Sequence, residues 1–198
     1  PVDERAWSIG PEDAPLKLSV WGDYSEPFTA RADTAIREIV ASRSDLRYVF
    51  RHYPANRGCN PYVQQIMFPF SCYASRAAEA AGELGGEAAY WKMHTWLLSN
   101  QSGFTEQNIV AAGAALGAEF GYDEQRFVEA YRGRDAKSAI DQDVRGAQRI
   151  GVQSLPTMTL NERKIPRWII GETVVLDRII DAAAKELAES KAAESAPK

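Results

Sequence analysis

Residues 16–29 read Leu-Lys-Leu-Ser-Val-Trp-Gly-Asp-Tyr-Ser-Glu-Pro-Phe-Thr, and this stretch decides the fold. Its first six residues alternate and are rich in strand formers, which predicts a strand over 16–21. After a short turn, Pro27 opens a segment with apolar and small residues at helical spacing, which predicts a helix over 27–42. A second strand is predicted over 46–53. Strand, helix and strand within about 40 residues form a βαβ unit with a right-handed crossover.

The rest of the chain predicts a helical region followed by a return to strands. Proline, glycine and asparagine breakers predict a loop over 55–69. Helices are then predicted over 71–84, 87–98, 105–116, 123–131 and 136–150. The last predicted elements are a strand over 157–160, a tight turn at Asn161-Glu162, a partner strand over 164–170, an amphipathic helix over 176–187 and a frayed tail from Glu189.

The composition bounds the class of protein and its partners. The 198 residues are 45% hydrophobic and 25% charged, which is ordinary for one globular domain with or without an insertion. The net charge of −4 argues against nucleic acid or an anionic membrane as the main partner, because both bind clustered Lys and Arg. No apolar run approaches the roughly 18 residues that span a bilayer. Because the chain begins at Pro1 rather than Met, we expect that a signal or anchor segment was removed.

Five segments together resemble the DsbA-like family of thiol-disulfide oxidoreductases. In chain order they are Gly-Pro-Glu-Asp-Ala-Pro at 10–15, Asp-Tyr-Ser-Glu-Pro-Phe-Thr at 23–29, Phe-Arg-His-Tyr-Pro at 50–54, Trp-Lys-Met-His at 91–94 and Gly-Val-Gln-Ser-Leu-Pro-Thr at 151–157. The resemblance implies an α/β thioredoxin-like fold (βαβ–ββα) with a DsbA-type α-helical insertion. It also implies a division of the chain into a thioredoxin-like domain of 1–54 and 151–188, a loop with the helical insertion over 55–150, and a flexible tail over 189–198.

The segment 23–29 resembles the family's D-[FY]-x-C-P-[FY]-C motif, but Glu26 and Thr29 stand at the two cysteine positions, around Pro27 and Phe28. A carboxylate and a hydroxyl do not exchange disulfides, so the sequence predicts no confident catalytic residue here. We expect an ionised Glu26 to cap the helix, which stabilises it by about 0.3–1 kcal/mol. We expect the Thr29 hydroxyl to bond a nearby backbone group. A new acid/base or metal site at this pair is the alternative.

Leu155-Pro156 is a second candidate site. The resemblance implies a cis-proline loop beside the helix N-terminus, where the residue before the proline pairs with extended substrate backbone. In one interpretation, Pro156 only shapes the turn into the next strand. In the other, the loop retains a peptide-docking edge with Pro27 and an apolar rim of Phe28, Trp21 or Tyr24, and Leu155.

The two cysteines, Cys59 and Cys72, lie in the predicted loop and at the start of the helix after it. Their even number is compatible with a disulfide in an oxidising compartment and equally with two buried thiols. The resemblance implies a disulfide in this region. Such a bond is either a loop staple, with a stabilising effect of about 3 kcal/mol in the chain-entropy model, or a relocated redox pair.

The remaining polar candidates are interpreted as structural. His52 and His94 are expected to be packed or partly exposed, and Asp141 and Asp143 are expected to lie on a solvated surface. No metal-ligand spacing occurs among the histidines, cysteines and carboxylates, so the sequence predicts neither a metal site nor a cofactor.

These patterns favour a periplasmic or otherwise extracytoplasmic protein that binds an extended polypeptide or a partner protein and is redox-inactive at the usual site. The alternative is a thiol-disulfide oxidoreductase that works through Cys59 and Cys72. A weaker alternative is a glutathione-dependent transferase or isomerase, which the negative charge of Glu26 disfavours because it would repel a glutathione thiolate. A binding protein is favoured over an enzyme.

Overall fold

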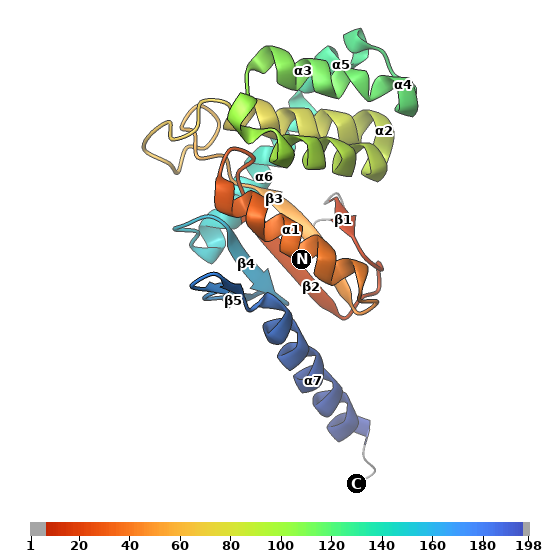
Figure 1. The fold of residues 1–198 in the computed structure, drawn as a ribbon, viewed down its shortest axis with the longest axis vertical. Coiled ribbons are helices and arrows are strands. Elements are labelled where there is room, and N and C mark those ends of the chain that lie inside the picture. The colour runs from red at the N-terminus through yellow and green to blue at the C-terminus, as the bar shows by residue number, and fades with distance from the viewer. Residues whose placement is uncertain (1–6, 196–198) are drawn as a thin grey trace.

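A five-stranded mixed sheet forms the centre of the computed structural model, which describes residues 7–195 (Figure 1). Its strand order is β1-β3-β2-β4-β5, and β2 and β3 are parallel while the other neighbours are antiparallel. The strands are β1 (Ser8–Ile9), β2 (Leu16–Gly22), β3 (Leu46–His52), β4 (Thr157–Leu160) and β5 (Arg163–Ile165). The predicted βαβ unit is confirmed, whereas β1 was not predicted.

The two faces of the sheet differ in polarity. Leu16, Leu18 and Val20 of β2 are buried in the main core, together with residues of α1 (Pro27–Ala41) and α7 (Leu176–Ser195). Because side chains alternate along a strand, Lys17, Ser19 and Trp21 lie on the opposite face. There, Trp21 packs with Ala147 of α6 (Arg134–Ile150). The sheet is therefore covered by α1 and α7 on one face and by α6 on the other.

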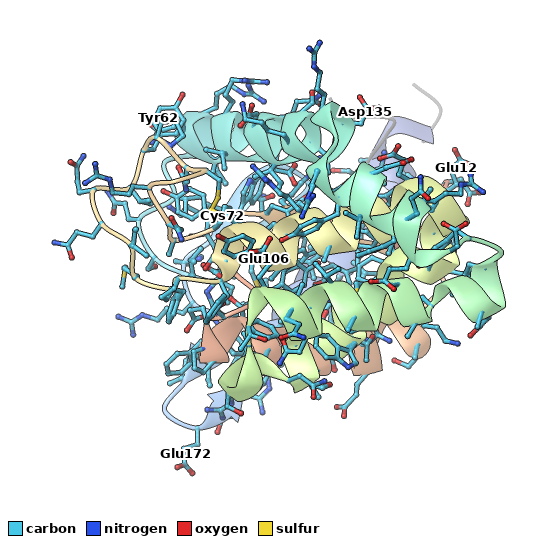
Figure 2. All side chains as sticks on the ribbon, turned by 90° about the horizontal axis from the view of Figure 1, so that it is seen from above. Glu12, Tyr62, Cys72, Glu106, Asp135 and Glu172 are labelled. Atoms are coloured by element: carbon cyan, nitrogen blue, oxygen red, sulfur yellow. A yellow bond between two sulfur atoms is a disulfide. The ribbon has the colours of Figure 1, made fainter. Side chains whose placement is uncertain are left out.

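Between β3 and β4 the chain forms a helical region that lies above the sheet in Figure 1. Its helices before α6 are α2 (Ser71–Ser99), a 3-10 turn at Gln101–Gly103, α3 (Glu106–Ala115), α4 (Gly117–Phe120) and α5 (Glu124–Arg132). The two helices predicted over 71–84 and 87–98 are confirmed, because Gly86 adopts a non-helical φ of 72° and separates the two halves of α2 at a kink. Seen from above, the loop that carries Tyr62 projects beyond the end of α2 where Cys72 lies (Figure 2).

The C-terminal part confirms one prediction and corrects another. The tight turn at Asn161 and Glu162 is confirmed, with φ values of 46° and 68°. The predicted strand over 164–170 is wrong, because it is divided into β5 and a separate hairpin of β6 (Ile169–Ile170) and β7 (Thr173–Val174). Pro166 lies at the break and has no N–H for a sheet hydrogen bond.

The predicted frayed tail is wrong as far as Ser195, because α7 continues to that residue. Alanine, glutamate and lysine are strong helix formers, which accounts for the extension. Residues 196–198 of the predicted tail lie outside the described residues. Within residues 7–195, no helix is both long enough and apolar enough to cross a membrane.

Candidate functional site

Glu26 is the N-cap of α1 and accepts the hydrogen bonds that the sequence predicts. Its carboxylate accepts from the Phe28 N–H at 2.9 Å and from the Thr29 N–H at 2.6 Å. The Thr29 hydroxyl also donates to this carboxylate at 2.8 Å and accepts from the Asp23 N–H at 3.3 Å. The two residues at the cysteine positions thus bond each other and occupy the free N–H groups of the first helical turn.

Replacing Glu26 by Gln is expected to lower the free energy of unfolding by about 0.5–1 kcal/mol at neutral pH. The amide keeps one acceptor oxygen, but it loses the charge that interacts favourably with the helix N-terminus. Urea unfolding of the two proteins measures the difference. A gain above about 1 kcal/mol would show instead that the carboxylate is held in a strained position, as at functional sites.

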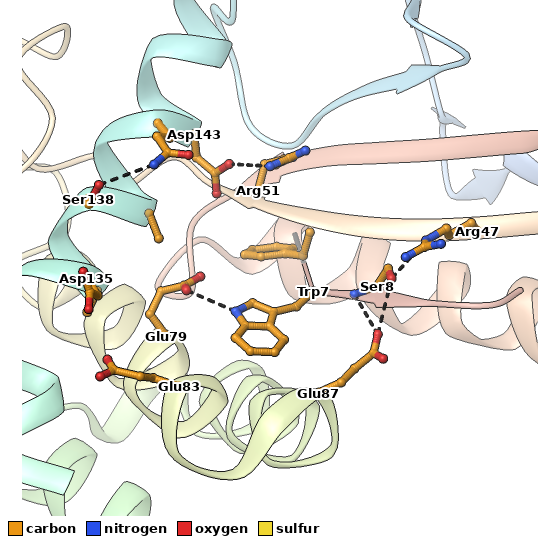
Figure 3. A pocket seen from close by; sticks show the side chains of 14 residues that line it. Trp7, Ser8, Arg47, Arg51, Glu79, Glu83, Glu87, Asp135, Ser138 and Asp143 are labelled. Carbon is orange, nitrogen blue, oxygen red and sulfur yellow. Dashed lines mark hydrogen bonds and ion pairs between the residues drawn. The ribbon is translucent and has the colours of Figure 1, made fainter. Parts of the chain in front are cut away.

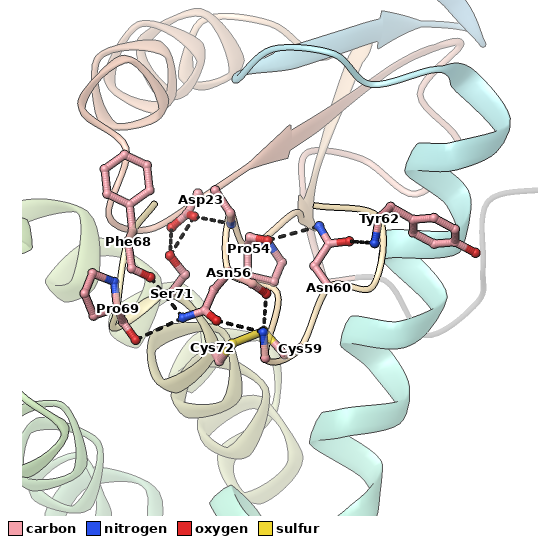
Figure 4. The surroundings of a disulfide bond; sticks show 12 residues. Asp23, Pro54, Asn56, Cys59, Asn60, Tyr62, Phe68, Pro69, Ser71 and Cys72 are labelled. Carbon is pink, nitrogen blue, oxygen red and sulfur yellow. Dashed lines mark hydrogen bonds between the residues drawn. A yellow bond between two sulfur atoms is a disulfide. The ribbon is translucent and has the colours of Figure 1, made fainter. Parts of the chain in front are cut away.

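Asp23 is a buried carboxylate that joins three segments next to Glu26 (Figure 4). It accepts hydrogen bonds from the Ser25 N–H at 2.8 Å, from the Ala55 N–H at 2.7 Å and from the Ser71 hydroxyl at 2.7 and 2.9 Å. Burial raises the pKa of Asp23 above its ordinary value of 3.8, and the accepted hydrogen bonds oppose this rise. The turn before α1, the chain after β3 and the start of α2 are therefore held together by one side chain.

The Leu155-Pro156 peptide bond is cis and lies at the same end of the sheet as Glu26. Trp21 pairs with Thr157 in the antiparallel register of β2 and β4, so Pro156 lies level with the end of β2, where the turn into α1 begins. Phe28, in the first turn of α1, is 54% exposed, and Leu155 is half-buried. Pro27 is exposed and Pro156 is buried.

Tyr24 does not contribute to the predicted rim, because its side chain is fully buried. Its hydroxyl bonds Nδ1 of His94 at 2.9 Å, and Nε2 of His94 lies 3.0 Å from Asp33. Trp21 is also buried, and its indole N–H donates to the Asp143 carbonyl at 3.1 Å. The exposed rim expected at Trp21 or Tyr24 is therefore wrong, because both rings are buried, although Leu155 packs against Trp21.

Both histidines are fully buried in hydrogen-bonded clusters, which supports their structural interpretation. Burial lowers the pKa of His94, and the neighbouring Asp33 only partly offsets this effect. Burial by itself would lower the pKa of His52, but its hydrogen bond to Glu79, at 2.6 Å, and the charge of Glu79 raise it.

The predicted exposure of Asp143 is wrong. Asp143 is only 8% exposed and accepts hydrogen bonds from Arg51 at 3.0 Å and from the His52 N–H at 2.8 Å. These contacts attach α6 to β3. The sequence contains a signal for this burial, because position 143 falls on the same helical face as Ile140, Val144 and Ala147, all buried.

Cys59 and Cys72 form a disulfide, which confirms their predicted pairing (Figure 4). Their Cα atoms are 5.9 Å apart, and the bond joins the loop to the first turn of α2. Asn56 organises the same loop, since its side chain accepts from the Gly58 N–H and donates to the carbonyls of Phe68 and Pro69. The disulfide is therefore part of a hydrogen-bonded loop rather than of the α1 site.

A separate cavity of about 550 Å³ lies between β3, α2 and α6 (Figure 3). Trp7 lies in its centre and donates to Glu79 at 3.1 Å, while the Ser8 N–H donates to Glu87 at 3.0 Å. The carboxylates of Glu83 and Asp135 also line this cavity. Nowhere in residues 7–195 do three or more histidine, cysteine or carboxylate side chains converge as metal ligands.

A thioredoxin-like sheet with a DsbA-type helical insertion defines the class of this protein. The chain belongs to the thioredoxin family, because the family model described as Thioredoxin matches residues 3–182.

Two solved structures show the same fold. A thioredoxin-like oxidoreductase from Silicibacter pomeroyi DSS-3 is 21% identical, with a TM-score of 0.68, and the match covers 92% of this chain and 94% of that chain. The thiol-disulfide exchange protein alpha-DsbA2 from Wolbachia pipientis is 19% identical, with a TM-score of 0.70, and the match covers 93% of this chain and 88% of that chain. At these identities the similarity shows the fold alone.

Among curated proteins, the chain is similar to part of a much longer one. It is 33% identical over 165 residues to Na(+)/H(+) antiporter NhaA 1 of Salinispora arenicola. The match covers 83% of this chain and 23% of that protein. The chain thus spans about a quarter of the length of the curated relatives that it matches.

Proposed function

We propose that this protein binds an extended polypeptide at the end of the sheet where α1 begins, and that it exchanges no disulfide there. The observation that carries this proposal is the open main chain of Leu155 at the same end of the sheet as the exposed ring of Phe28. Within the described residues, the N–H and C=O groups of Leu155 make no hydrogen bond to another residue. They are thus free to pair with a peptide strand, while Phe28 offers an apolar contact.

The chemistry of the neighbouring residues supports binding without redox activity. Glu26 and Thr29 carry no thiol, and the N–H groups that would stabilise a thiolate already bond Glu26. The Cys59–Cys72 disulfide supports an extracytoplasmic location, because disulfides persist in oxidising compartments.

Titration with a fluorescein-labelled, S-carboxymethylated insulin B chain tests this proposal, since that probe is extended and has no free thiol. The Phe28→Ser variant is expected to bind roughly ten- to a hundredfold more weakly, because a buried aromatic contact contributes about 1.5–3 kcal/mol. The matched control is Ile170→Ser in the separate β6–β7 hairpin, since Ile170 is similarly exposed, at 59%. Unchanged affinity of Phe28→Ser, or no binding to the wild type, would contradict the proposal.

A relocated redox pair at Cys59 and Cys72 is the second candidate, because Cys72 lies in the first turn of α2, where a helix N-terminus stabilises a thiolate. For a structural disulfide we expect a reduction potential below about −300 mV. Alkylation and mass spectrometry across a dithiol redox series measure this potential. A value of roughly −230 to −120 mV would instead assign thiol-disulfide exchange to this pair.

The glutathione alternative has no support in the geometry of the site. A glutathione thiolate would need the α1 N–H groups that Glu26 occupies, and it would meet the negative charge of that carboxylate.

A further inference from the structure

A second cleft lies on the face of the sheet that α6 only partly covers. Its volume is about 760 Å³, within the range of about 300–1,000 Å³ typical of small-molecule sites. Residues of β2, β4 and α6 form its walls. Its polar character follows from the alternation along β2, because Leu16, Leu18 and Val20 face the core and leave Lys17 and Ser19 on the cleft side.

Four cations and two carboxylates line the cleft, which is therefore positively charged in a chain whose net charge is −4; the cations are Lys17, Arg51, Arg145 and Arg149, and the carboxylates are Asp143 and Glu162. Lys17, Arg145 and Arg149 line it, and in the part of the chain that the structure describes none of the three forms an ion pair. Arg51 also lines the cleft, but its guanidinium is paired with Asp143. Unpaired cations in a concave site attract anions more strongly than the same charges on a convex surface.

The two arginines of α6 lie one helical turn apart beside an aromatic wall. Arg145 and Arg149 are four residues apart and therefore share a helix face. Gly146 lies between them, and a Cβ atom there would be 3.7 Å from the Arg149 guanidinium and 3.8 Å from the Trp21 ring. Because Gly146 has no side chain, an edge of the largely buried Trp21 indole lines the cleft next to the Arg149 guanidinium.

The opposite wall offers hydrogen-bonding groups that suit a polar ligand. Ser19 and Thr159 pair across β2 and β4 and place two hydroxyl groups in the cleft. The turn residue Asn161 lies at its far end and is held by the Lys17 N–H and the Pro15 carbonyl. Apolar, cationic and hydroxyl groups thus converge on one concave surface.

We propose that this cleft binds a small organic anion with a phosphate or carboxylate group and a planar apolar part. The arginines of α6 hold the acidic group, and the planar part lies along Trp21 at Gly146. Guanidinium groups form bidentate hydrogen bonds with both kinds of acid, which supports this choice of ligand. The cleft runs along the α6 side of β2 from Lys17 to Trp21, and its proposed ligand does not depend on peptide binding at Leu155 and Phe28.

Calorimetric titration with 1-naphthyl phosphate tests the proposal. We expect binding at least about tenfold tighter than that of 1-naphthol, which lacks the charge, and of inorganic phosphate, which lacks the ring. The variant Arg145→Gln/Arg149→Gln should lose at least about tenfold in affinity. The matched control is Arg134→Gln, an exposed arginine at the start of the same helix, and its affinity should be unchanged.

A steric variant tests the position of the ligand independently of charge. Gly146→Leu should abolish binding by filling the space beside Trp21, whereas Gly146→Ala should fold normally, because its Cβ meets neighbours only at ordinary contact distances. Circular dichroism verifies that both variants are folded. Equal binding of 1-naphthol and 1-naphthyl phosphate, full affinity in the double arginine variant, or full affinity in a folded Gly146→Leu protein would each overturn the proposal.

Discussion

Replacing Glu26 and Thr29 together by cysteine is expected to create dithiol-disulfide exchange activity at the start of α1. The first thiol would take the place of a carboxylate that accepts the N–H groups of Phe28 and Thr29. A thiolate there receives the same hydrogen bonds and the same helix dipole. A shift of the cysteine pKa from about 8.5 to 7 or below raises the thiolate fraction at neutral pH roughly tenfold or more.

The measurement is dithiol-dependent insulin reduction, and the double variant should reduce insulin faster than the wild type, which has no thiol at either position. The control is the Glu26→Ser/Thr29→Ser variant, which has the same backbone and no thiol at either position. Two residues three positions apart in a first helical turn are close enough for a disulfide, and mass analysis verifies that it forms. A double variant that forms this disulfide but reduces insulin no faster than the serine control would contradict the prediction.

Replacing Asp23 by Ala is expected to lower the free energy of unfolding by about 3 kcal/mol or more. The change leaves the N–H groups of Ser25 and Ala55 and the hydroxyl of Ser71 without their acceptor. Each unsatisfied buried group costs about 1–3 kcal/mol, and partial hydration reduces the sum. Denaturant unfolding measures the loss, and Asp13→Ala, at an exposed position, should stay within about 0.5 kcal/mol of the wild type.

The stability of the wild type and that of the Asp23→Ala variant should also depend differently on pH. Burial raises the folded-state pKa of Asp23 above its ordinary value of 3.8, so the folded state binds a proton more tightly than the unfolded state does. The associated stabilisation is complete below pH 3.8 and is lost as the pH rises through the raised folded pKa. The difference in stability between wild type and Asp23→Ala should therefore shrink from acid towards neutral pH. A difference that grows over that range would contradict the raised pKa.

The sequence predicts elements well where the determinants are local. The strand over 16–21, the helix from Pro27 and the helix predicted over 105–116 all follow from neighbouring residues, and the structure confirms them. The strand predicted over 164–170 is wrong because Pro166, which has no N–H to donate, interrupts the ladder within this apolar stretch.

The same difference between local and distant contacts separates the polar residues of the candidate sites that could be predicted from those that could not. The cap formed by Glu26 involves residues within three positions of it, so its geometry could be predicted. The burial of Asp143 depends on Arg51 and His52, which are about ninety residues away in the chain. The residue spacing along α6 could predict a buried face, but it could not identify the residues that this face contacts. The burial of Tyr24 likewise depends on a distant residue, because its hydrogen-bond partner His94 lies seventy residues away in the chain.

By itself, the sequence determined the strand over 16–21, the helix that follows it and the capping role of Glu26, because these depend on contacts between near neighbours. Tertiary structure alone decided that Asp23 holds three segments together, that Tyr24 points inward, and that Lys17 and Arg149 line one cleft. These features arise where segments far apart in the chain pack against each other, and alternation or helical spacing within one segment carries no information about the other.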